Sequence, residues 1–397
     1  MMKEYWFTIY PHCFLWMKGE EGLVYNTKNY TKILFCNEGL LAKKTGQLVV
    51  MENLYCIRLT EEELADEKLN EWVQNMVAQE CGALVVDNGI NQRPLSLPPI
   101  LKVQDEADYY RWEHRQGIDG NVIENLHRLV FHINGSKYGN ELYAKQTLYP
   151  TVSSETLSAK DILRFAMNAR VSPFLTEISL VGNPFAYEGL EDLIESLKTI
   201  CPVSVYCTWQ DAMNSLDKVQ ELAMKTNLNI VVAECTSLAD LSQEANYTFL
   251  VNSLQTYDVI LECKDKYNLE HVDIVPIYAG NNLSFFEECL YMDDESIQDI
   301  ALDKREVFIR QKLNIQDFGR LTVMNDGKVY SNPNHSAIGH IGETPHALVY
   351  REITEGSSWL RIRDQKPCCD CIYQWLCPSP SHYEDVIGKP NLCHIKS

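Results

Sequence analysis

The stretch Leu129-Val130-Phe131-His132-Ile133-Asn134 opens a long region in which short β-rich runs alternate with helical patterns. A helical pattern follows at 159–169 and a strand pattern at 177–181, and the alternation continues to a last strand at 272–277. Strands that alternate with helices predict βα units on a parallel sheet. About six strands in roughly 160 residues favour a partial (β/α) barrel over the complete eight-stranded form. We assign residues 121–310 to this partial barrel.

Downstream of the alternation, residues 321–330 predict a β-hairpin. Two short apolar runs flank Asn325-Asp326-Gly327, and Asp-Gly between such runs is the strongest short-range hairpin signal. A stretch that contains Gly, His and Pro then leads to a cysteine-rich tail. We assign residues 311–397 to a C-terminal, cysteine-rich domain.

Five of the fourteen cysteines fall between 368 and 393. Four of them have the spacing Cys-x2-Cys-x5-Cys plus one distant cysteine, and we call them the tail cysteines: Cys368, Cys371, Cys377 and Cys393. Four thiolates can surround one zinc ion or one iron–sulfur cluster. The spacing therefore predicts one metal site with a structural role, since four protein ligands leave no open position for a substrate. Spacing alone does not choose between zinc and iron.

Residues 1–87 combine strand and helix patterns. Runs at 5–9, 23–25, 33–35 and 55–59 predict strands, and apolar residues of helical period predict helices near 39–50 and 66–81. This mixture is consistent with a small winged-helix-like domain. Residues 88–99 are rich in Asn, Gly and Pro, which predicts a linker, and a polar helix is expected at 106–114. We assign residues 88–120 to this linker and connecting helix.

Charge and hydropathy exclude two classes of partner. The 397-residue chain has a formal net charge of −20 and a sequence pI near 4.9. Nucleic acids and anionic membranes both require a basic patch, so we expect neither as a partner. No run approaches the ~18 apolar residues of a membrane span, and the first ten residues lack the pattern of a secretory signal. We therefore expect a cytoplasmic protein, in which clustered cysteines indicate metal ligands rather than disulfides.

The tail spacing resembles the SPASM domain that follows the barrel in radical SAM peptide maturases. The resemblance maps the tail cysteines onto the ligands of an auxiliary cluster, and so implies one [4Fe-4S] cluster, with zinc as the alternative. Ser381 stands where the family carries a further cysteine, and residues 330–334 carry none near the hairpin. The resemblance therefore implies one intact auxiliary site and one that is erased.

Residues 129–134 resemble the first strand of a radical SAM barrel, and Gly182-Asn183-Pro184 resembles its SAM-binding turn. Where the family carries its Cys-x3-Cys-x2-Cys motif, residues 135–141 hold no cysteine, and that motif occurs nowhere in the sequence. SAM cleavage needs a cluster iron that three thiolates leave open to the methionine group. The resemblance thus implies no SAM-cleaving cluster, no catalytic residues and no cofactor-binding residues in the barrel. A repurposed pocket near His132, Asn134, Lys137 and Tyr138 is an alternative to a structural role for these residues.

Residues 1–87 resemble the RiPP recognition element, the module that binds leader peptides in or beside such maturases. There a leader segment adds as a strand to the sheet and packs on a helix. The resemblance implies peptide contacts at Thr31, Ile33, Phe35, Trp72 and Met76. A winged-helix-like domain without a peptide role is the alternative.

As a whole, the chain resembles the pseudo-radical-SAM/SPASM proteins of double-glycine-leader peptide maturation systems in Bacteroidales. This implies a non-catalytic adaptor that binds a precursor leader peptide and partners an active radical SAM maturase. Two alternatives stay open. One is an enzyme that uses SAM or another small molecule in the barrel by non-radical chemistry, and the other is a purely structural subunit.

Overall fold

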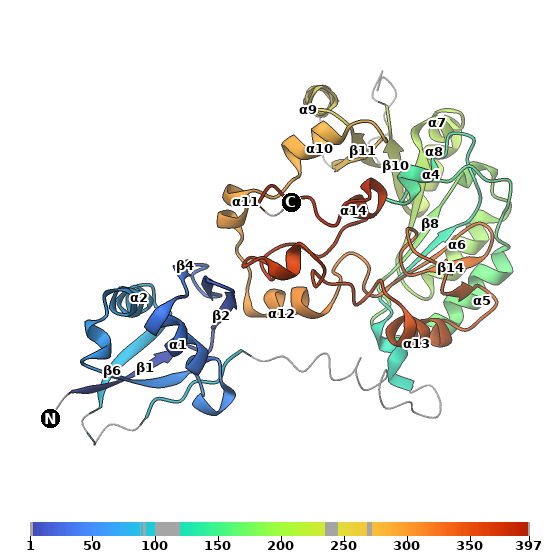
Figure 1. Cartoon of the computed structure of the whole chain (residues 1–397). Helices are drawn as coiled ribbons and strands as arrows, with labels where there is room; N and C mark the ends of the chain where they lie inside the picture. The colour runs from blue at the N-terminus through green and yellow to red at the C-terminus, as the bar shows by residue number, and fades with distance from the viewer. Residues whose placement is uncertain are drawn as a thin grey trace.

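The computed structural model describes residues 3–87, 89, 93–99, 120–234, 245–267 and 272–395. Figure 1 shows a small N-terminal domain beside a larger α/β body, and part of the C-terminal segment (residues 283–395) lies between the two. The body is built on one large, mostly parallel sheet. The α/β class predicted from the strand–helix alternation is therefore confirmed.

The N-terminal domain contains two three-stranded antiparallel sheets, of order β5-β1-β6 and β2-β3-β4. The strands are β1 (Glu4–Ile9), β2 (Cys13–Lys18), β3 (Glu21–Asn26), β4 (Lys32–Cys36), β5 (Cys56–Thr60) and β6 (Gly82–Asp87). The helices are α1 (Gly39–Leu48) and α2 (Glu67–Ala78). All strands and helices that we expected are present. The domain is nevertheless richer in strands than a winged-helix module, because β2 and β6 complete two sheets.

The sheet β2-β3-β4 is buried on both faces near its centre. Val24 and Ile33 pack with Trp72 of α2 in the core of the domain. Leu23 and Tyr25 point the other way and pack against residues of the C-terminal segment. Alternate residues of one strand thus join two separate hydrophobic clusters, as the two-residue period of a strand requires.

Helix α2 begins where the sequence places a cap. The Asp66 side chain accepts from the Leu69 amide at 2.9 Å, which satisfies one of the unpaired donors of the first turn. Just upstream, Thr60 and Glu63 bond reciprocally at 3.1 and 3.2 Å around a short 3-10 turn. Both capping signals therefore operate, and together they fix the start of α2 against β5.

The α/β body is built on a nine-stranded sheet of order β12-β11-β10-β9-β8-β7-β13-β14-β15. The strands are β7 (Arg128–His132), β8 (Glu177–Val181), β9 (Val203–Thr208), β10 (Asn227–Val232), β11 (Asn246–Val251), β12 (Val272–Pro276), β13 (Arg320–Val323), β14 (Lys328–Tyr330) and β15 (Gly339–His340). Strands β7 to β13 run parallel. From β7 to β12 the spatial order follows the chain without reversal, as in a barrel and unlike a doubly wound sheet. Within the described residues the sheet is open, because β12 and β15 form its two ends.

The helices that connect these strands pack on one face of the sheet. They are α5 (Ala159–Ala169), α6 (Leu190–Lys198), α7 (Trp209–Met213), α8 (Leu216–Lys225) and α9 (Leu254–Tyr267). Leu129 and Phe131 point toward them and join the main hydrophobic core. Right-handed crossovers with no reversal of strand order place every connecting helix on the same side. The other face of the sheet is covered by loops, by the short helix at 141–144 and by part of the C-terminal segment (Figure 1).

The predicted hairpin is confirmed, with β13 and β14 as its strands. Gly327 adopts a φ of +80° in its turn, a conformation that favours glycine. β13 also pairs in parallel with β7, with Leu321 opposite Leu129. The hairpin therefore continues the barrel sheet across residue 310, where the sequence places a domain boundary.

The remaining helices lie partly on the α/β body and partly around the tail. They are α4 (Glu141–Ala144), α10 (Leu283–Cys289), α11 (Asp294–Asp299), α12 (Lys304–Lys312), α13 (Pro345–Glu355) and α14 (His382–Ile387). Tyr383 of α14 donates to the Pro276 carbonyl at the end of β12 at 2.8 Å. This bond attaches the C-terminal segment to the far end of the sheet.

The described part of the linker lies along the N-terminal domain. Arg93 donates to the Cys56 carbonyl at 2.9 Å and lies over the Trp6 ring at 5.6 Å, and the Ser96 amide donates to Leu54. The expected helix at 106–114 lies outside the described residues. Among the helices that are described, none is both long enough and apolar enough to cross a membrane.

Candidate functional site

A groove of about 240 Å³ lies between the edge strand β4 and helix α2. Ile33, Leu34 and Phe35 line it from β4, and Trp72 lines it from α2. The other lining residues are Cys36, Leu41, Lys68, Glu71 and Asn75. In Figure 1 the two elements lie beside each other on the upper side of the N-terminal domain. Strand and helix thus form two walls with a space between them.

β4 has an unpaired edge, because β3 is its one strand neighbour among the described residues. At the two ends of this ladder, the amides of Asn26 and Asn37 donate to the opposite carbonyls at 3.0 and 2.7 Å. Bonded and non-bonded pairs alternate along an antiparallel ladder. Both ends of the ladder are bonded pairs, and every second pair between them is bonded. Leu34, which lies opposite Leu23, therefore falls at a non-bonded pair. The backbone N–H and C=O of Leu34 therefore point away from β3, toward the open edge.

The floor of the groove is aromatic and tightly packed. The Phe35 and Trp72 rings lie 5.4 Å apart, and Trp72 meets Phe7 edge-on at 5.3 Å. The Phe35 ring also covers Gly22 on β3, where an added Cβ would lie 2.1 Å from the ring. Trp72 is 4% exposed, whereas Leu34 at the rim is 48% exposed. The groove therefore offers a preformed apolar floor below an exposed strand.

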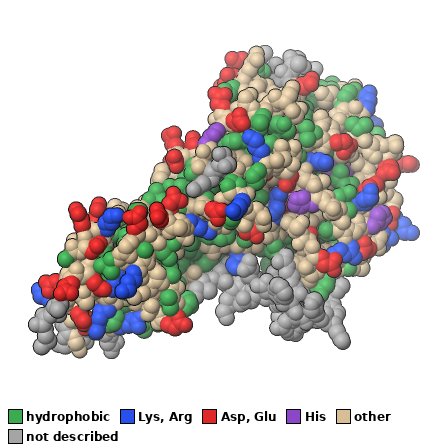
Figure 2. Space-filling model, viewed as in Figure 1, with side chains coloured by type: hydrophobic (Ala, Val, Ile, Leu, Met, Phe, Trp, Pro, Cys, Tyr) green, Lys and Arg blue, Asp and Glu red, His purple; other side chains and the backbone are tan. Residues whose placement is uncertain are grey.

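The rim of the groove is polar. Lys68 and Glu38 form an exposed ion pair at 3.3 Å, and this partner raises the pKa of Lys68. The Cys36 thiol bonds to the same carboxylate, which raises the pKa of the thiol. Figure 2 shows acidic side chains, with fewer basic ones, along the upper side of this domain. Exposed ion pairs contribute about 0–1 kcal/mol, so the floor rather than the rim carries the binding potential.

The structure brings together three of the five residues expected to contact a peptide. Ile33, Phe35 and Trp72 line the groove. Met76 does not line it, because it is fully buried in the domain core. Thr31 lies before β4, where its carbonyl is bonded to Asn26 in the turn. Sequence reasoning missed Leu34, Cys36, Leu41, Lys68, Glu71 and Asn75, although i, i+3 and i+7 spacing could have placed the last three on one helix face.

The tail cysteines lie on and beside one compact loop. Cys368 begins a 3-10 turn that ends at Asp370, and Cys371 and Cys377 follow on the segment that we call the cysteine loop, residues 368–377. Cys393 lies on the last segment of the chain, which pairs with the backbone at Met292. The Met292 amide donates to the Leu392 carbonyl at 3.0 Å. Burial raises the pKa of Cys377 to about 12, and the charges of the other three tail cysteines add to this rise. The nearby Arg363 charge opposes this rise.

Two donors lie against these thiols. Arg363 Nη1 lies 3.7 Å from Cys368 Sγ, and the Ile395 amide donates to Cys393 Sγ at 3.3 Å. Arg363 also pairs with Glu384 at 2.9 Å, which fixes the guanidinium in place. Donors and positive charge stabilise thiolates, the form of cysteine that binds metals. Cys369 makes a different contact: its carbonyl accepts from Lys18 of β2 at 2.7 Å.

The donor set of the tail fits a thiolate-bound metal, but the side chains are not drawn together around one point. Four sulfur donors with N–H partners have the chemistry that zinc and iron–sulfur clusters require. Across the described ranges, however, no three His, Cys, Asp or Glu side chains form a group that could hold a metal ion. Metal binding would require the four side chains to converge.

The backbone and asparagine groups at the carboxyl end of β7 are bonded within the fold, whereas the buried His132 Nδ1 has no hydrogen-bond partner among the described residues. Asn134 donates to the Asn183 carbonyl at 2.9 Å and accepts from the Asn183 amide at 2.8 Å. The Asn325 side chain donates to the His132 carbonyl at 3.1 Å. His132 itself is buried, which lowers the pKa of its imidazole to about 4. The sequence left open a repurposed pocket near these residues. In the structure their hydrogen bonds join β7, β8 and the hairpin.

The segment after β7 is also closely packed. A Cβ on Gly135 would lie 2.1 Å from the Ser153 carbonyl oxygen, and one on Gly139 would lie 2.3 Å from the Thr151 carbonyl carbon. Tyr138 accepts from Asn214 at 3.1 Å. The backbone of residues 150–153 therefore lies directly against residues 135–139, where the resemblance places the lost cluster motif.

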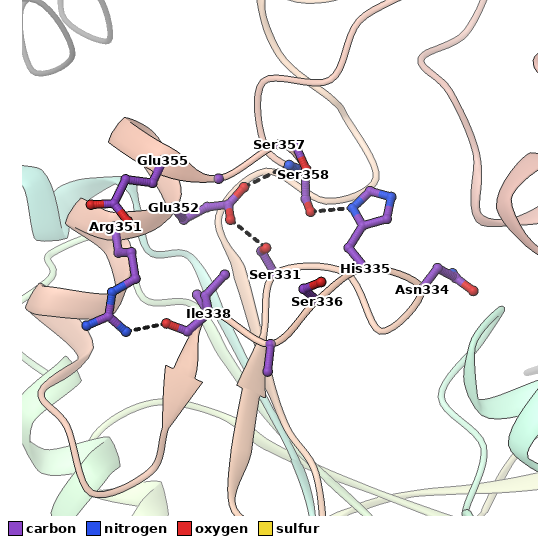
Figure 3. A pocket seen from close by; sticks show the side chains of 12 residues that line it. Ser331, Asn334, His335, Ser336, Ile338, Arg351, Glu352, Glu355, Ser357 and Ser358 are labelled. Atoms are coloured by element: carbon purple, nitrogen blue, oxygen red, sulfur yellow. Dashed lines mark hydrogen bonds between the residues drawn. The ribbon is translucent and has the colours of Figure 1, made fainter.

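A second cavity, of about 510 Å³, lies in the C-terminal segment and is lined by polar side chains (Figure 3). Ser358 Oγ lies 2.7 Å from His335 Nδ1, and His335 Nε2 lies 3.7 Å from Asp385. The sequence of contacts from serine to histidine to aspartate resembles a hydrolytic triad. Glu352, however, accepts from the Ser358 and Trp359 amides at 2.9 and 2.8 Å. A hydrolytic serine needs nearby amides that can stabilise an oxyanion, and here the Glu352 carboxylate already occupies the amides of Ser358 and Trp359. The arrangement therefore supports a structural role.

Neither a protein-family model nor a curated protein sequence matches the chain. Similar solved structures include Streptococcus suis SuiB, with a TM-score of 0.44 and 11% identity over 98% of this chain and 100% of that chain. SuiB bound to S-adenosylmethionine has a TM-score of 0.39 and 10% identity, covering 96% and 97% of the two chains. BtrN in complex with AdoMet and 2-DOIA has a TM-score of 0.30 and 10% identity, covering 58% and 88%. These likenesses are too distant to assign a function to this chain.

Proposed function

We propose that this protein is a non-catalytic adaptor that captures an extended segment of a ribosomal precursor peptide and partners a radical SAM maturase. The single observation that carries the proposal is the open edge of β4 beside the groove. Leu34 presents an outward N–H and C=O there, next to an aromatic floor formed by Phe35 and Trp72. A peptide that adds as a strand gains main-chain hydrogen bonds from the edge, and its alternate side chains enter the groove.

The absence of chemistry in the barrel is part of the proposal. The sequence has no Cys-x3-Cys-x2-Cys motif, and residues 135–139 pack against the backbone of residues 150–153. The tail cysteines would hold one metal, an iron–sulfur cluster or zinc. When bound, that metal would cross-link the cysteine loop to the chain at Cys393.

Selection from a displayed library of random 12-residue peptides tests the peptide-binding function and does not require the natural ligand to be identified. The full wild-type chain is the bait, and the full chain with Leu34→Pro is the matched negative-control bait. Proline removes the outward N–H and is tolerated on an edge strand where that N–H faces solvent, so the β3–β4 ladder is kept. Leu34→Ala is the control, because it shortens the same side chain but keeps the N–H.

The proposal predicts that selected peptides bind Leu34→Pro about tenfold more weakly than the wild type, the loss expected for one hydrogen bond. The loss for Leu34→Ala should be smaller. Equal affinity for the wild type and Leu34→Pro, or no enrichment over the Leu34→Pro bait, would contradict strand addition at β4. Circular dichroism confirms that each variant is folded.

A further inference from the structure

Strand β3, which pairs with β4, and the cysteine loop meet in one buried cluster. Leu23 and Tyr25 of β3 pack there with Ile372 and Leu376 of the cysteine loop. Leu23 lies directly opposite Leu34 on β4. One buried strand therefore separates the loop from the edge at which we propose that a peptide binds.

Polar contacts fix this junction as well. Tyr25 Oη accepts from the Leu302 amide at 2.6 Å and donates to the Leu302 carbonyl at 2.9 Å. Lys18 of β2 donates to the Cys369 carbonyl at 2.7 Å. Lys32, the first residue of β4, donates to the carbonyls of Ile300 and Gln298 at the end of α11, at 2.7 and 2.9 Å. All three strands of the peptide-binding sheet are thus bonded to the backbone of the C-terminal segment.

Two of the tail cysteines contribute to the cluster directly. Cys371 is buried within it, and Cys377 packs against it. Cys368 and Cys393 are not members of the cluster, although Cys393 is bridged to Met292 and accepts from the Ile395 amide, and both of these residues pack against it. A metal held by all four would restrain both ends of the segment that carries Ile372 and Leu376. Metal binding by thiolates is coupled to the folding of the segment that supplies them.

We propose that the cysteine loop regulates the affinity of the β4 edge for its peptide. An ordered loop completes the cluster behind β3 and holds β4 in place, so less conformational entropy is lost when a peptide strand adds. The coupling is reciprocal, so bound peptide would also strengthen the hold of the tail cysteines on a bound metal. This inference rests on the proposed peptide-binding function of β4.

The test uses the full chain, reconstituted anaerobically with ferrous iron and sulfide or loaded with zinc. Cys393→Ala removes one ligand that is not itself a member of the shared cluster. Cys369→Ala is the matched control, because Lys18 bonds to its backbone carbonyl, which alanine retains. Three readouts are compared: metal content, anisotropy of a fluorescent peptide selected on the wild type, and hydrogen exchange of residues 32–36.

We expect Cys393→Ala to lose metal, to bind the peptide about fivefold more weakly, and to exchange faster at residues 32–36. Exchange in β1, which belongs to the other sheet, should not change. Cys369→Ala should match the wild type in all three readouts. Loss of metal with unchanged affinity and unchanged exchange would overturn the coupling and leave the peptide-binding function intact.

Two further outcomes are also decisive. If the wild type holds no metal, Leu376→Ala perturbs the loop side of the cluster directly, and unchanged exchange at residues 32–36 would then overturn the coupling. If no peptide is enriched on the wild type, the proposed function fails. Exchange at residues 32–36 in Cys393→Ala still decides whether the loop controls the edge.

Discussion

The edge of β4 and the carboxyl end of β7 present opposite arrangements of polar groups. On β4, the backbone of Leu34 points toward an open edge beside a groove of about 240 Å³. At the end of β7, Asn134 and Asn183 bond to each other, and Asn325 bonds to the His132 carbonyl. Unpaired strand edges attract another strand, whereas groups bonded within the fold hold it together. The difference favours binding on the N-terminal domain and a structural role for the end of β7.

The largest expected effect concerns the barrel side of this comparison. The chain alone should produce no 5′-deoxyadenosine from SAM, because residues 135–141 carry no cysteine to hold a cluster. The measurement is anaerobic incubation with dithionite and SAM, followed by chromatography against a no-protein control. Multiple-turnover production of 5′-deoxyadenosine would reverse the assignment of the two regions.

Loss of one tail cysteine should have the next largest effect. Cys377→Ala should abolish stoichiometric metal binding, because a site with three thiolate ligands binds a structural metal far less tightly than a site with four thiolate ligands. Cys369→Ala should retain the metal. Elemental analysis of anaerobically purified protein decides between iron and zinc. Equal metal content in both variants would show that the four residues are not a ligand set.

The buried imidazole of His132 makes stability depend on pH. Burial lowers the pKa of His132 to about 4, whereas an unfolded histidine has a pKa of about 6.5. Between these values the unfolded chain binds a proton that the folded chain excludes. The free energy of unfolding should therefore fall as pH drops from about 6.5 toward 4, by about 3 kcal/mol in full.

Urea unfolding of the wild type and His132→Gln between pH 7 and 4.5 measures this contribution. The variant does not titrate at this position, so its stability should depend less on pH by most of that amount. An identical slope in the two proteins would mean that His132 is accessible to protons, and so would point to a solvated pocket at the end of β7.

The junction behind the β4 edge should show the smallest effect. Tyr25→Phe removes the hydroxyl that bonds twice to Leu302 but keeps the buried ring. The free energy of unfolding should fall by about 1 kcal/mol, the usual net contribution of such bonds. Tyr30→Phe is the control, since Tyr30 is 42% exposed. Equal stability of the two variants in urea would show that the junction contributes little.

Patterns local in the chain were enough to predict much of the fold. The strand–helix alternation and the Asn325-Asp326-Gly327 turn predicted the correct strands, because hydrophobic period and turn chemistry act over a few residues. β2 escaped prediction, since Phe14 and Leu15 are buried in different clusters on opposite faces and leave no polar alternation. The pairing of β13 with β7 joins residues about 190 positions apart along the sequence, and no local pattern reports it.

The candidate site was predictable only in part. The edge position of β4 was implied by the resemblance to the RiPP recognition element, and Ile33 and Phe35 alternate as a strand should. The apolar stripe of α2 contains both Trp72 and Met76, yet Trp72 lines the groove and Met76 lies in the core. Periodicity gives the buried face of a helix but not which part of it borders a neighbouring strand. That distinction depends on how α2 packs on the sheet.

The central claim is that a peptide adds as a strand to β4, and exchange at single amides tests it most directly. In the free protein, the Phe35 amide lies at a bonded pair of the ladder and Leu34 does not. We predict that a selected peptide at saturating concentration slows exchange of the Leu34 amide at least about tenfold. The Phe35 amide should change little, since it is protected already. A bound peptide that leaves the Leu34 amide exchanging at its free rate would contradict the account.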